Sequence, residues 1–317
     1  ETEKKEIEVE IKLLEKKKKE FSPLPPYTTD TLLRDANAIF KLSSKKIMGI
    51  LQDLFENGLI TYHRTDSTRV SDRGKAIAKE YLKEHFYGRS WQKEGAHECI
   101  RPTRAFDRDT LKRLIQEKIL KTEYLSFLHF GLYDLIFRRF MASQAKPFEG
   151  EVYVYELKYD KKVQKEERVV SAQGKAWELF HSFQILPPLP LGKRKVKLEI
   201  RKIPEKPLFS ESEIIRLMKE KGIGRPSTYA TLIERLFLRH YIKEKRGKVF
   251  STKRGEEVFD YLSSNYKDFI DEKRTKEMQE KMDKIEKGEI DFQECLRNLY
   301  EEVRKIQKKD EREKKSF

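Results

Sequence analysis

Strand-like and helix-like segments follow one another along this chain in separate blocks. Ile7, Val9 and Ile11 alternate with charged residues, which is the period of a strand with one face exposed to water. The next strand-like segments, EVYVYELKY, ERVVSA and KRKVKLEIRKI, come only after Phe148, and the intervening residues have mainly helical patterns. We therefore expect the opening and middle strands to form one β domain, with a helical block inserted into it.

This order predicts a mainly α fold with β structure, of the α+β class. The chain has 317 residues, enough for two or three domains. We predict the start of a β domain at residues 1–21, an inserted helical domain at 22–148 and the return of the β domain at 149–207. Residues 208–317 would form a further helical domain that ends in a frayed tail, DEREKKSF.

The two helical blocks resemble each other, which indicates an internal repeat. A helix, a tight turn and a two-strand wing fit both segments, a winged helix-turn-helix pattern that is common in nucleic-acid-binding proteins. Tyr62 corresponds to Glu244, so the shared fold does not require a tyrosine there. At a constant offset, Ile50, Leu51, Leu54, Phe55, Ile60 and Arg64 align with Leu232, Ile233, Leu236, Phe237, Ile242 and Arg246.

Composition narrows the class of partner. Charged residues make up 39% of the chain and the formal net charge is +15, which favours a polyanion such as nucleic acid. A Lys- and Glu-rich thermophile surface is the alternative explanation, and both can hold together. The two cysteines form no CxxC pair, so no zinc finger is encoded, and a reducing, cytoplasmic location is expected. No apolar run reaches membrane-spanning length.

The segment GLITYHRTDST, from Gly58 to Thr68, places one tyrosine among polar and charged residues. If LITYHR is a strand, Tyr62 and Arg64 share one face, with Thr61 and His63 on the other. A guanidinium beside the phenol would favour the phenolate and hold a phosphate. The alternative is a half-buried structural tyrosine beside an Arg64–Asp66 surface ion pair.

Several longer motifs resemble those of type IA DNA topoisomerases. GLITYHRTDSTRVSD is similar to the nucleophile motif of that family, EGAHECIRPTR to its histidine-bearing motif, and GIGRPSTYATLIERL to its late DNA-contact motif. PPYTTDTLLRDA and LYDLIFRRFMASQ resemble flanking segments. The motifs occur in family order, and YHRTDSTRVSD and GAHECIRPTR are most similar to the reverse gyrase branch. The resemblance implies a toroid fragment with winged-helix-like domains and a β domain.

The resemblance also implies roles for residues of the inserted block. Tyr62 would attack a phosphate of single-stranded DNA, Arg64 would bind that phosphate, and His97 would contact a nearby phosphate or assist the transition state. Thr61 and Asp66 would position the nucleophile segment. A structural histidine is the alternative for His97.

Further DNA contacts are implied at two places, one before the nucleophile motif and one in the late motif. Glu56 matches an acidic residue near the active centre, although a solvated helix face explains it as well. In the late motif Arg225, Ser227 and Thr228 would grip the single strand. We expect Ser227 to begin a helix there, whose start would be a natural phosphate site, with a simple capped helix as the alternative.

The cofactors of this family would belong to parts that the sequence does not show. The Mg²⁺ site lies in a Toprim domain with an Asp-x-Asp-x-Glu run, and Asp107-Arg108-Asp109 lacks the third acid. Reverse gyrases use ATP through a helicase-like part, and the chain contains no GxxxxGKT loop. We expect no metal or ATP to be bound by this chain itself.

The sequence predicts a piece of a larger enzyme. The chain begins with Glu rather than Met, and its expected partners are DNA and the Toprim and helicase-like parts, on the same polypeptide or on a second subunit. A non-enzymatic winged-helix DNA-binding clamp is the competing hypothesis. It explains the charge and the repeat, but it leaves the Tyr62 and His97 motifs unexplained.

Overall fold

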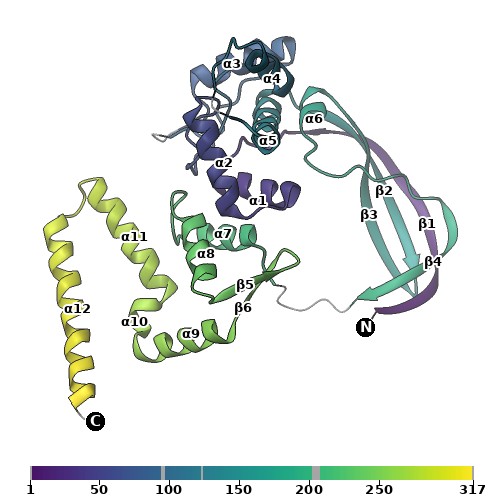
Figure 1. The fold of residues 1–317 in the computed structure, drawn as a ribbon. Helices are drawn as coiled ribbons and strands as arrows, with labels where there is room; N and C mark the ends of the chain where they lie inside the picture. The colour runs from purple at the N-terminus through teal and green to yellow at the C-terminus, as the bar shows by residue number, and fades with distance from the viewer. Residues whose placement is uncertain (1, 94–96, 123, 202–207, 316–317) are drawn as a thin grey trace. The chain divides into compact units, whose positions relative to one another are not determined.

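The computed structural model describes residues 2–93, 97–122, 124–201 and 208–315. It divides into two compact units, residues 1–212 and 213–317, and each is described by itself. Helices and strands both contribute, as the α+β class predicts (Figure 1). In the described ranges, no helix is long and apolar enough to cross a membrane.

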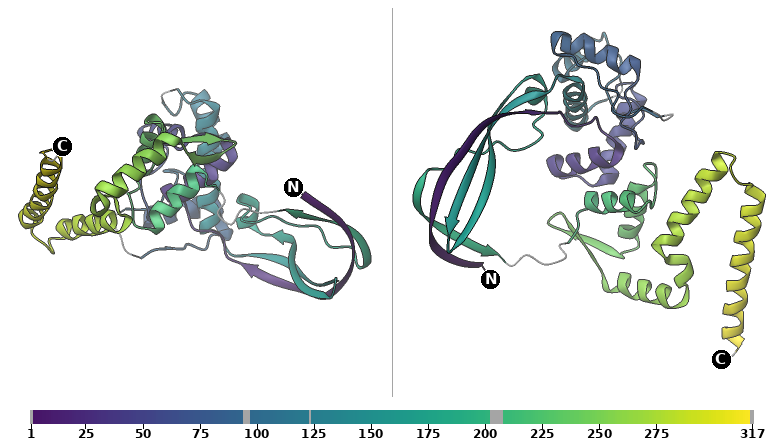
Figure 2. Two further views of the ribbon diagram at one scale, coloured as in Figure 1. Left: turned by 90° about the horizontal axis from the view of Figure 1, so that it is seen from below. Right: turned by 180° about the vertical axis from the view of Figure 1, so that it is seen from behind.

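An antiparallel sheet of four strands is the first element of unit 1. Its strands are β1 (Thr2–Phe21), β2 (Phe148–Tyr159), β3 (Lys162–Gln173) and β4 (Gly192–Arg201), in the order β3-β2-β1-β4. The opening segment is thus a strand, as its periodicity predicts, and β1 lies between two strands from the middle of the chain. The long strands bend strongly (Figure 2).

One face of this sheet is apolar. Ile7, Val9 and Ile11 alternate along β1 and are buried with Tyr155 of β2. Each buried aliphatic side chain of this kind stabilises the folded state by about 1.5–3 kcal/mol relative to exposure. The charged residues between them remain at the surface, which matches the strand period in the sequence.

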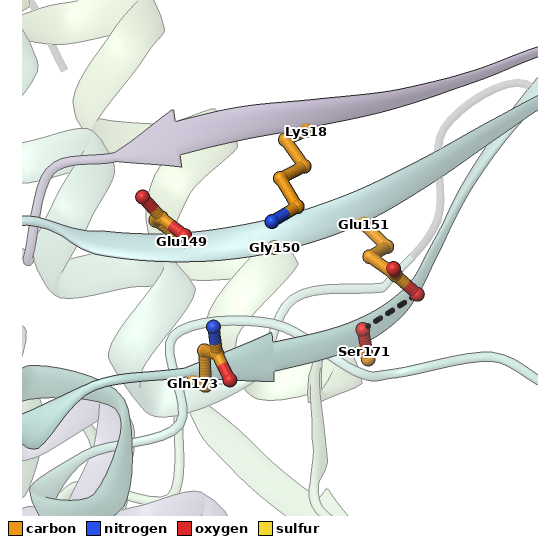
Figure 3. A pocket seen from close by; sticks show the side chains of 6 residues that line it. All are labelled: Lys18, Glu149, Gly150, Glu151, Ser171 and Gln173. Atoms are coloured by element: carbon orange, nitrogen blue, oxygen red, sulfur yellow. Dashed lines mark hydrogen bonds between the residues drawn. The ribbon is translucent and has the colours of Figure 1, made fainter.

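A small polar pocket of about 200 Å³ lies on the sheet (Figure 3). Gly150 is needed in its wall, because a Cβ there would come within 2.9 Å of the backbone oxygen of Ser171. Two carboxylates, Glu149 and Glu151, face this pocket with one ammonium group, Lys18. This charge balance does not favour an anion.

The inserted block packs around one buried helix, α5 (Phe127–Gln144). Leu132, Ile136 and Phe140 of α5 are fully buried. The surrounding helices and turns are α1 (Thr29–Phe40), α2 (Ser44–Glu56), α3 (Asp72–Leu82), η1 (Lys83–His85), α4 (Arg108–Gln116) and the short α6 (Lys175–Leu179), which follows β3.

Arg139 of α5 joins the helical block to the connection from β1. Its Nε donates a 2.7 Å hydrogen bond to the backbone oxygen of Pro25. Its guanidinium lies over the rings of Tyr27 and Phe180, 4.9 and 4.6 Å from their centroids. Asp35 completes the surroundings, with an Oδ2 3.8 Å from Nη1. The buried cation thus holds the chain where it leaves the sheet.

Unit 2 contains a winged helix-turn-helix pattern followed by helices. β5 and β6 pair as a short antiparallel hairpin directly after α8, as the repeat predicts for this segment. The elements from the end of unit 1 onward are α7 (Glu211–Glu220), α8 (Tyr229–Leu238), β5 (Ile242–Lys245), β6 (Lys248–Ser251), α9 (Lys253–Asn265), α10 (Lys267–Ile270), α11 (Glu272–Glu286) and α12 (Phe292–Lys315).

Two local predictions are wrong. The segment LITYHR is not a strand, and the first repeat has no wing, because Ile60 forms only an isolated bridge with Pro102. The backbone partners of this segment come from residues 99–103 instead of from a hairpin neighbour. At the other end of the chain, α12 extends to Lys315, into the segment predicted to be a frayed tail.

We predict that Arg139→Ala destabilises unit 1 by about 3 kcal/mol, because it removes a buried cation and leaves the Pro25 carbonyl without its donor. Chemical denaturation followed by circular dichroism measures the change. Arg34→Ala is the control: Arg34 also pairs with Asp35 but is about half exposed, so its loss should cost about 1 kcal/mol or less. Equal effects would contradict the role of Arg139.

Candidate active site

Thr29, the first residue of α1, fixes the backbone after Tyr62. Its hydroxyl donates to the carbonyl oxygens of His63 and Thr65, at 2.8 and 2.9 Å. The backbone N–H of Thr65 donates to the same hydroxyl at 2.9 Å, and the Thr29 N–H donates to the Thr65 carbonyl at 2.8 Å. A residue from the PPYTTDT motif therefore determines the path of the YHRTD segment.

The segment that contains Cys99 and Arg101 fixes the backbone before Tyr62. The Thr61 N–H donates to the Arg101 carbonyl oxygen at 2.9 Å, and the Thr61 hydroxyl donates to the Cys99 carbonyl oxygen at 2.8 Å. The Arg101 N–H donates back to the Thr61 hydroxyl at 3.0 Å. Thr61, predicted to position the nucleophile segment, thus binds the HECIRPTR motif directly.

The Tyr62 side chain projects from this fixed backbone and is 41% exposed. Its ring packs edge-on against Phe55 of α2, with 5.4 Å between the centroids. The His97 ring lies 6.4 Å away on the same measure. The structure therefore brings Tyr62 and His97 together from two motifs that are far apart in the sequence.

Exposure alternates along the segment although it is not a strand. Tyr62 and Asp66 are exposed and Arg64 is half-buried, whereas His63 and Thr65 are buried. The predicted division of this segment into two opposite faces is not confirmed, because the Tyr62 and His63 rings lie 5.6 Å apart and Thr61 is half-buried like Arg64. Among the described residues no ion pair joins Arg64 to Asp66, and the buried Nε of Arg64 has no hydrogen-bond partner there.

His63 is fully buried between the rings of Phe55 and Tyr62. Neither of its ring nitrogens has a hydrogen-bond partner within the described part of the chain. Burial, with a smaller effect of the Arg64 charge, lowers its pKa from 6.5 to about 4, while Glu56 opposes this shift. His63 is therefore a neutral imidazole near pH 7.

Glu56 and His97 are both at the surface of the site. Glu56 ends α2, is exposed and accepts a 2.7 Å hydrogen bond from Nε2 of Gln52. His97 is exposed, and its carbonyl oxygen accepts from Nε of Arg69 at 3.2 Å. The Arg69 carbonyl oxygen in turn accepts a hydrogen bond from the Cys99 N–H. The segment that follows Tyr62 therefore helps to position His97.

Arg225, Ser227 and Thr228 belong to unit 2. Arg225 is occupied: its Nη2 donates to both carboxylate oxygens of Asp283 at 2.7 Å, and its Nη1 donates to Oε1 of Gln279 at 2.8 Å. The prediction that Ser227 begins a helix is wrong, because α8 begins at Tyr229 with Thr228 as its N-cap. The hydroxyl of Thr228 is used in a turn with the Arg225 backbone.

This turn depends on a glycine. Gly224 has a φ of +81°, and a Cβ there would lie 3.1 Å from the Tyr229 ring and 3.2 Å from the Met218 methyl group. A larger residue would therefore strain the backbone and displace α7 or α8. The exposed Ser227 and Thr228 side chains follow immediately.

Sequence reasoning missed several residues of the site. Thr29, Arg101 and Glu98 lie within the quoted motifs, but none of them was singled out. Arg101 is 4% exposed and binds Glu98 through Nε and Nη2 at 2.9 and 2.8 Å. Threonine is common at the start of a helix, and Arg–Glu pairs three residues apart are also common. These patterns therefore do not predict which distant residues Thr29 and Arg101 contact.

The described residues do not fit a metal ion. Among them, no group of three or more His, Cys, Asp or Glu side chains lies close enough together to hold one. No step of the chemistry below is therefore assigned to a metal held by these residues.

Comparison with known proteins decides the family. A family model described as DNA topoisomerase matches residues 1–297. The chain belongs to the type IA DNA topoisomerase family. It is 42% identical over 316 residues to the reverse gyrase of Pyrococcus furiosus, covering 93% of this chain and 25% of that protein. Reverse gyrase 2 of Aquifex aeolicus is also 42% identical, over 92% of this chain and 26% of its own length.

A solved structure of the same family supports the fold. Full-length topoisomerase I from Thermotoga maritima matches with a TM-score of 0.75 and 32% identity, covering 95% of this chain and 52% of that one. The chain spans about a quarter of the length of each of the two reverse gyrases named above. The similarity covers both compact units.

The buried imidazole makes a pH-dependence testable. As pH falls below 6.5 the unfolded chain binds a proton at His63, whereas the folded chain does not until about pH 4, so stability falls with pH across this window. We predict that acidification from pH 7 to 4.5 costs the wild type about 2 kcal/mol more than His63→Phe, which cannot titrate. Guanidinium denaturation at each pH measures the difference, and parallel curves would contradict it.

Proposed function

We propose that this chain is the DNA-cleaving and strand-passing part of a reverse gyrase-like type IA topoisomerase. The observation that carries the proposal is the placement of Tyr62. Its phenol is exposed while the backbone on both sides is fixed by Thr29 and Arg101, with the His97 ring nearby and Arg64 two residues along the chain. A structural tyrosine needs no such arrangement of polar groups around an accessible hydroxyl.

In the proposed reaction the Tyr62 hydroxyl oxygen attacks a backbone phosphorus of single-stranded DNA. A P–O bond to tyrosine forms and the bond to the 3′ oxygen breaks, leaving a 5′-phosphotyrosine and a 3′-hydroxyl that receives the proton. The guanidinium of Arg64 stabilises charge on the phosphate, and His97 contacts a neighbouring oxygen. Attack by the 3′-hydroxyl reverses both bond changes and rejoins the strand.

Other parts of the enzyme complete this reaction. We assign Mg²⁺ to a Toprim part and ATP to a helicase-like part, on the same polypeptide or on a second subunit, and positive supercoiling to the assembled enzyme. The domains would be those of the sequence analysis, with residues 22–148 carrying the nucleophile within the β domain of 1–21 and 149–207. DNA is the substrate, and a cytoplasmic location is part of the proposal.

Tyr62→Phe tests the chemistry. We predict that the wild type, supplied with a Toprim-containing part and Mg²⁺, retains 3′-labelled single-stranded DNA after denaturation, whereas Tyr62→Phe retains none. Tyr124→Phe is the control, because it removes the hydroxyl of another exposed tyrosine of unit 1. Labelled adduct in Tyr62→Phe would exclude the role of Tyr62. DNA binding without adduct in the wild type would favour the non-enzymatic clamp.

Arg225 provides a test of the proposed DNA grip in unit 2. A phosphate that reaches Arg225 must displace Asp283, so we predict that Asp283→Asn raises single-strand affinity about three- to ten-fold at low salt. Fluorescence anisotropy with a labelled oligonucleotide measures this. Asp260→Asn removes an equal charge from α9 and should have a smaller effect. An equal gain in single-strand affinity in both variants would show that the change in net charge alone causes the effect.

A further inference from the structure

A cavity of about 400 Å³ lies beside the candidate active site, on the side of Gly58. It has three arginines and one carboxylate in its wall. The walls are formed by Gly58, Arg73, Glu98, Arg101, Thr103 and Arg104. None of the roles proposed above for Tyr62, Arg64 and His97 uses these side chains.

The carboxylate of this cavity is neutralised within its wall. Glu98 accepts two hydrogen bonds from Arg101, at 2.9 and 2.8 Å, and one from the Ser71 hydroxyl at 2.7 Å. Burial opposes ionisation of Glu98, but these hydrogen bonds hold its pKa below the ordinary value. Glu98 is therefore ionised, and the Glu98–Arg101 pair carries no net charge.

The remaining two arginines leave the cavity with positive charge. Arg73 and Arg104 are exposed, and within the described ranges neither has an ion-pair partner. The Arg104 guanidinium lies 5.9 Å from the centroid of the Phe106 ring. The pocket on the sheet (Figure 3) has the opposite balance, two carboxylates and one ammonium group. The cavity beside Gly58 is thus suited to an anion with several oxygens.

The cavity is rigidly connected to the nucleophile segment. Arg101, which lines it, accepts a hydrogen bond from the Thr61 N–H and donates its own N–H to the Thr61 hydroxyl, and Thr61 is the residue before Tyr62. Thr103 donates its hydroxyl to the Gly58 carbonyl at 2.6 Å and its N–H to the Leu59 carbonyl at 3.1 Å. An anion in the cavity would therefore be held at a fixed position relative to the tyrosine.

Gly74 keeps the buried arginine in place. A Cβ at Gly74 would come within 2.9 Å of Nε and 3.1 Å of Cδ of Arg101, so only glycine lets this side chain pass against α3. The Arg101–Glu98 pair forms the buried wall of the cavity, and Arg73, one residue before Gly74, adds a cation from the first turn of α3.

We infer that this cavity binds a backbone phosphate of the DNA strand at a position other than the one that Tyr62 attacks. The inference rests on the proposed function, since it assumes that the same face receives DNA. Arg73 and Arg104 provide the charge and the forked donors that match phosphate oxygens. The second phosphate fixes the strand along the nucleophile segment, so the cavity serves to position the substrate.

The test compares the wild type with the double variant Arg73→Ala/Arg104→Ala in the full chain. We expect the double variant to bind a labelled single-stranded oligonucleotide about ten-fold more weakly, with the slope of log affinity against log salt smaller by about 1. The control is Lys79→Ala/Arg113→Ala, which removes two exposed cations of α3 and α4 outside the cavity. Equal losses in the two double variants would overturn the inference.

Neutral methylphosphonate groups, placed one at a time in the oligonucleotide, locate the contact. We expect one position to weaken binding to the wild type and to have no further effect in the Arg73→Ala/Arg104→Ala variant. If every position weakens both proteins equally, no discrete phosphate site exists. Titration with inorganic phosphate at constant ionic strength tests whether the cavity binds a free anion instead of DNA. If it binds free phosphate alone, the double variant loses phosphate binding but keeps the DNA affinity of the wild type.

These outcomes are separable from failure of the proposed chemistry. The oligonucleotide measurements require binding and no cleavage, so they can support the cavity even if no covalent adduct forms. Thermal melting of each variant checks the fold, and both target arginines are exposed, so we expect unchanged melting temperatures. A lower melting temperature only in Arg73→Ala/Arg104→Ala, with DNA affinity equal to the control, would assign the two arginines to stability.

Discussion

Hydrogen bonds between backbone segments that are far apart in sequence hold Tyr62 in position, and the site depends on them. The Thr29 hydroxyl binds the carbonyls of His63 and Thr65, and Thr61 binds Cys99 and Arg101. Three segments, none of which is a regular strand at this point, thus satisfy one another's polar groups. The tyrosine between them needs no further support, so its hydroxyl can remain accessible.

The same arrangement explains how one segment holds groups with opposite requirements. Tyr62 and Asp66 face solvent, while His63 is buried and neutral because its charged form would lose hydration and lie near Arg64. Within the described residues, the two ring nitrogens of His63 and the buried Nε of Arg64 have no hydrogen-bond partner. Burying unpaired polar atoms of this kind lowers the free energy of unfolding. Buried polar groups without partners need an explanation, and a group supplied by a ligand or by another part of an enzyme is one of them.

The basic residues of the chain differ in whether a carboxylate already binds them. Arg225 is bound to Asp283, and Arg101 to Glu98, whereas Arg73, Arg104 and the Nε of Arg64 lack such partners in the described part of the chain. The net charge of +15 therefore does not by itself indicate which part of the surface would bind a polyanion. The pairing of each cation decides which of them can bind a phosphate without first releasing a carboxylate.

The sequence by itself determined the order of the elements, the strand period of the opening segment, and the motifs of the family. These follow from local periodicity and from residue identity, which need no knowledge of distant contacts. Tertiary structure decided that LITYHR is not a strand, that α8 begins at Tyr229, and that Thr29, Arg101 and Glu98 belong to the site. Each of these depends on a partner many residues away or on competition between backbone hydrogen bonds, which no local pattern records.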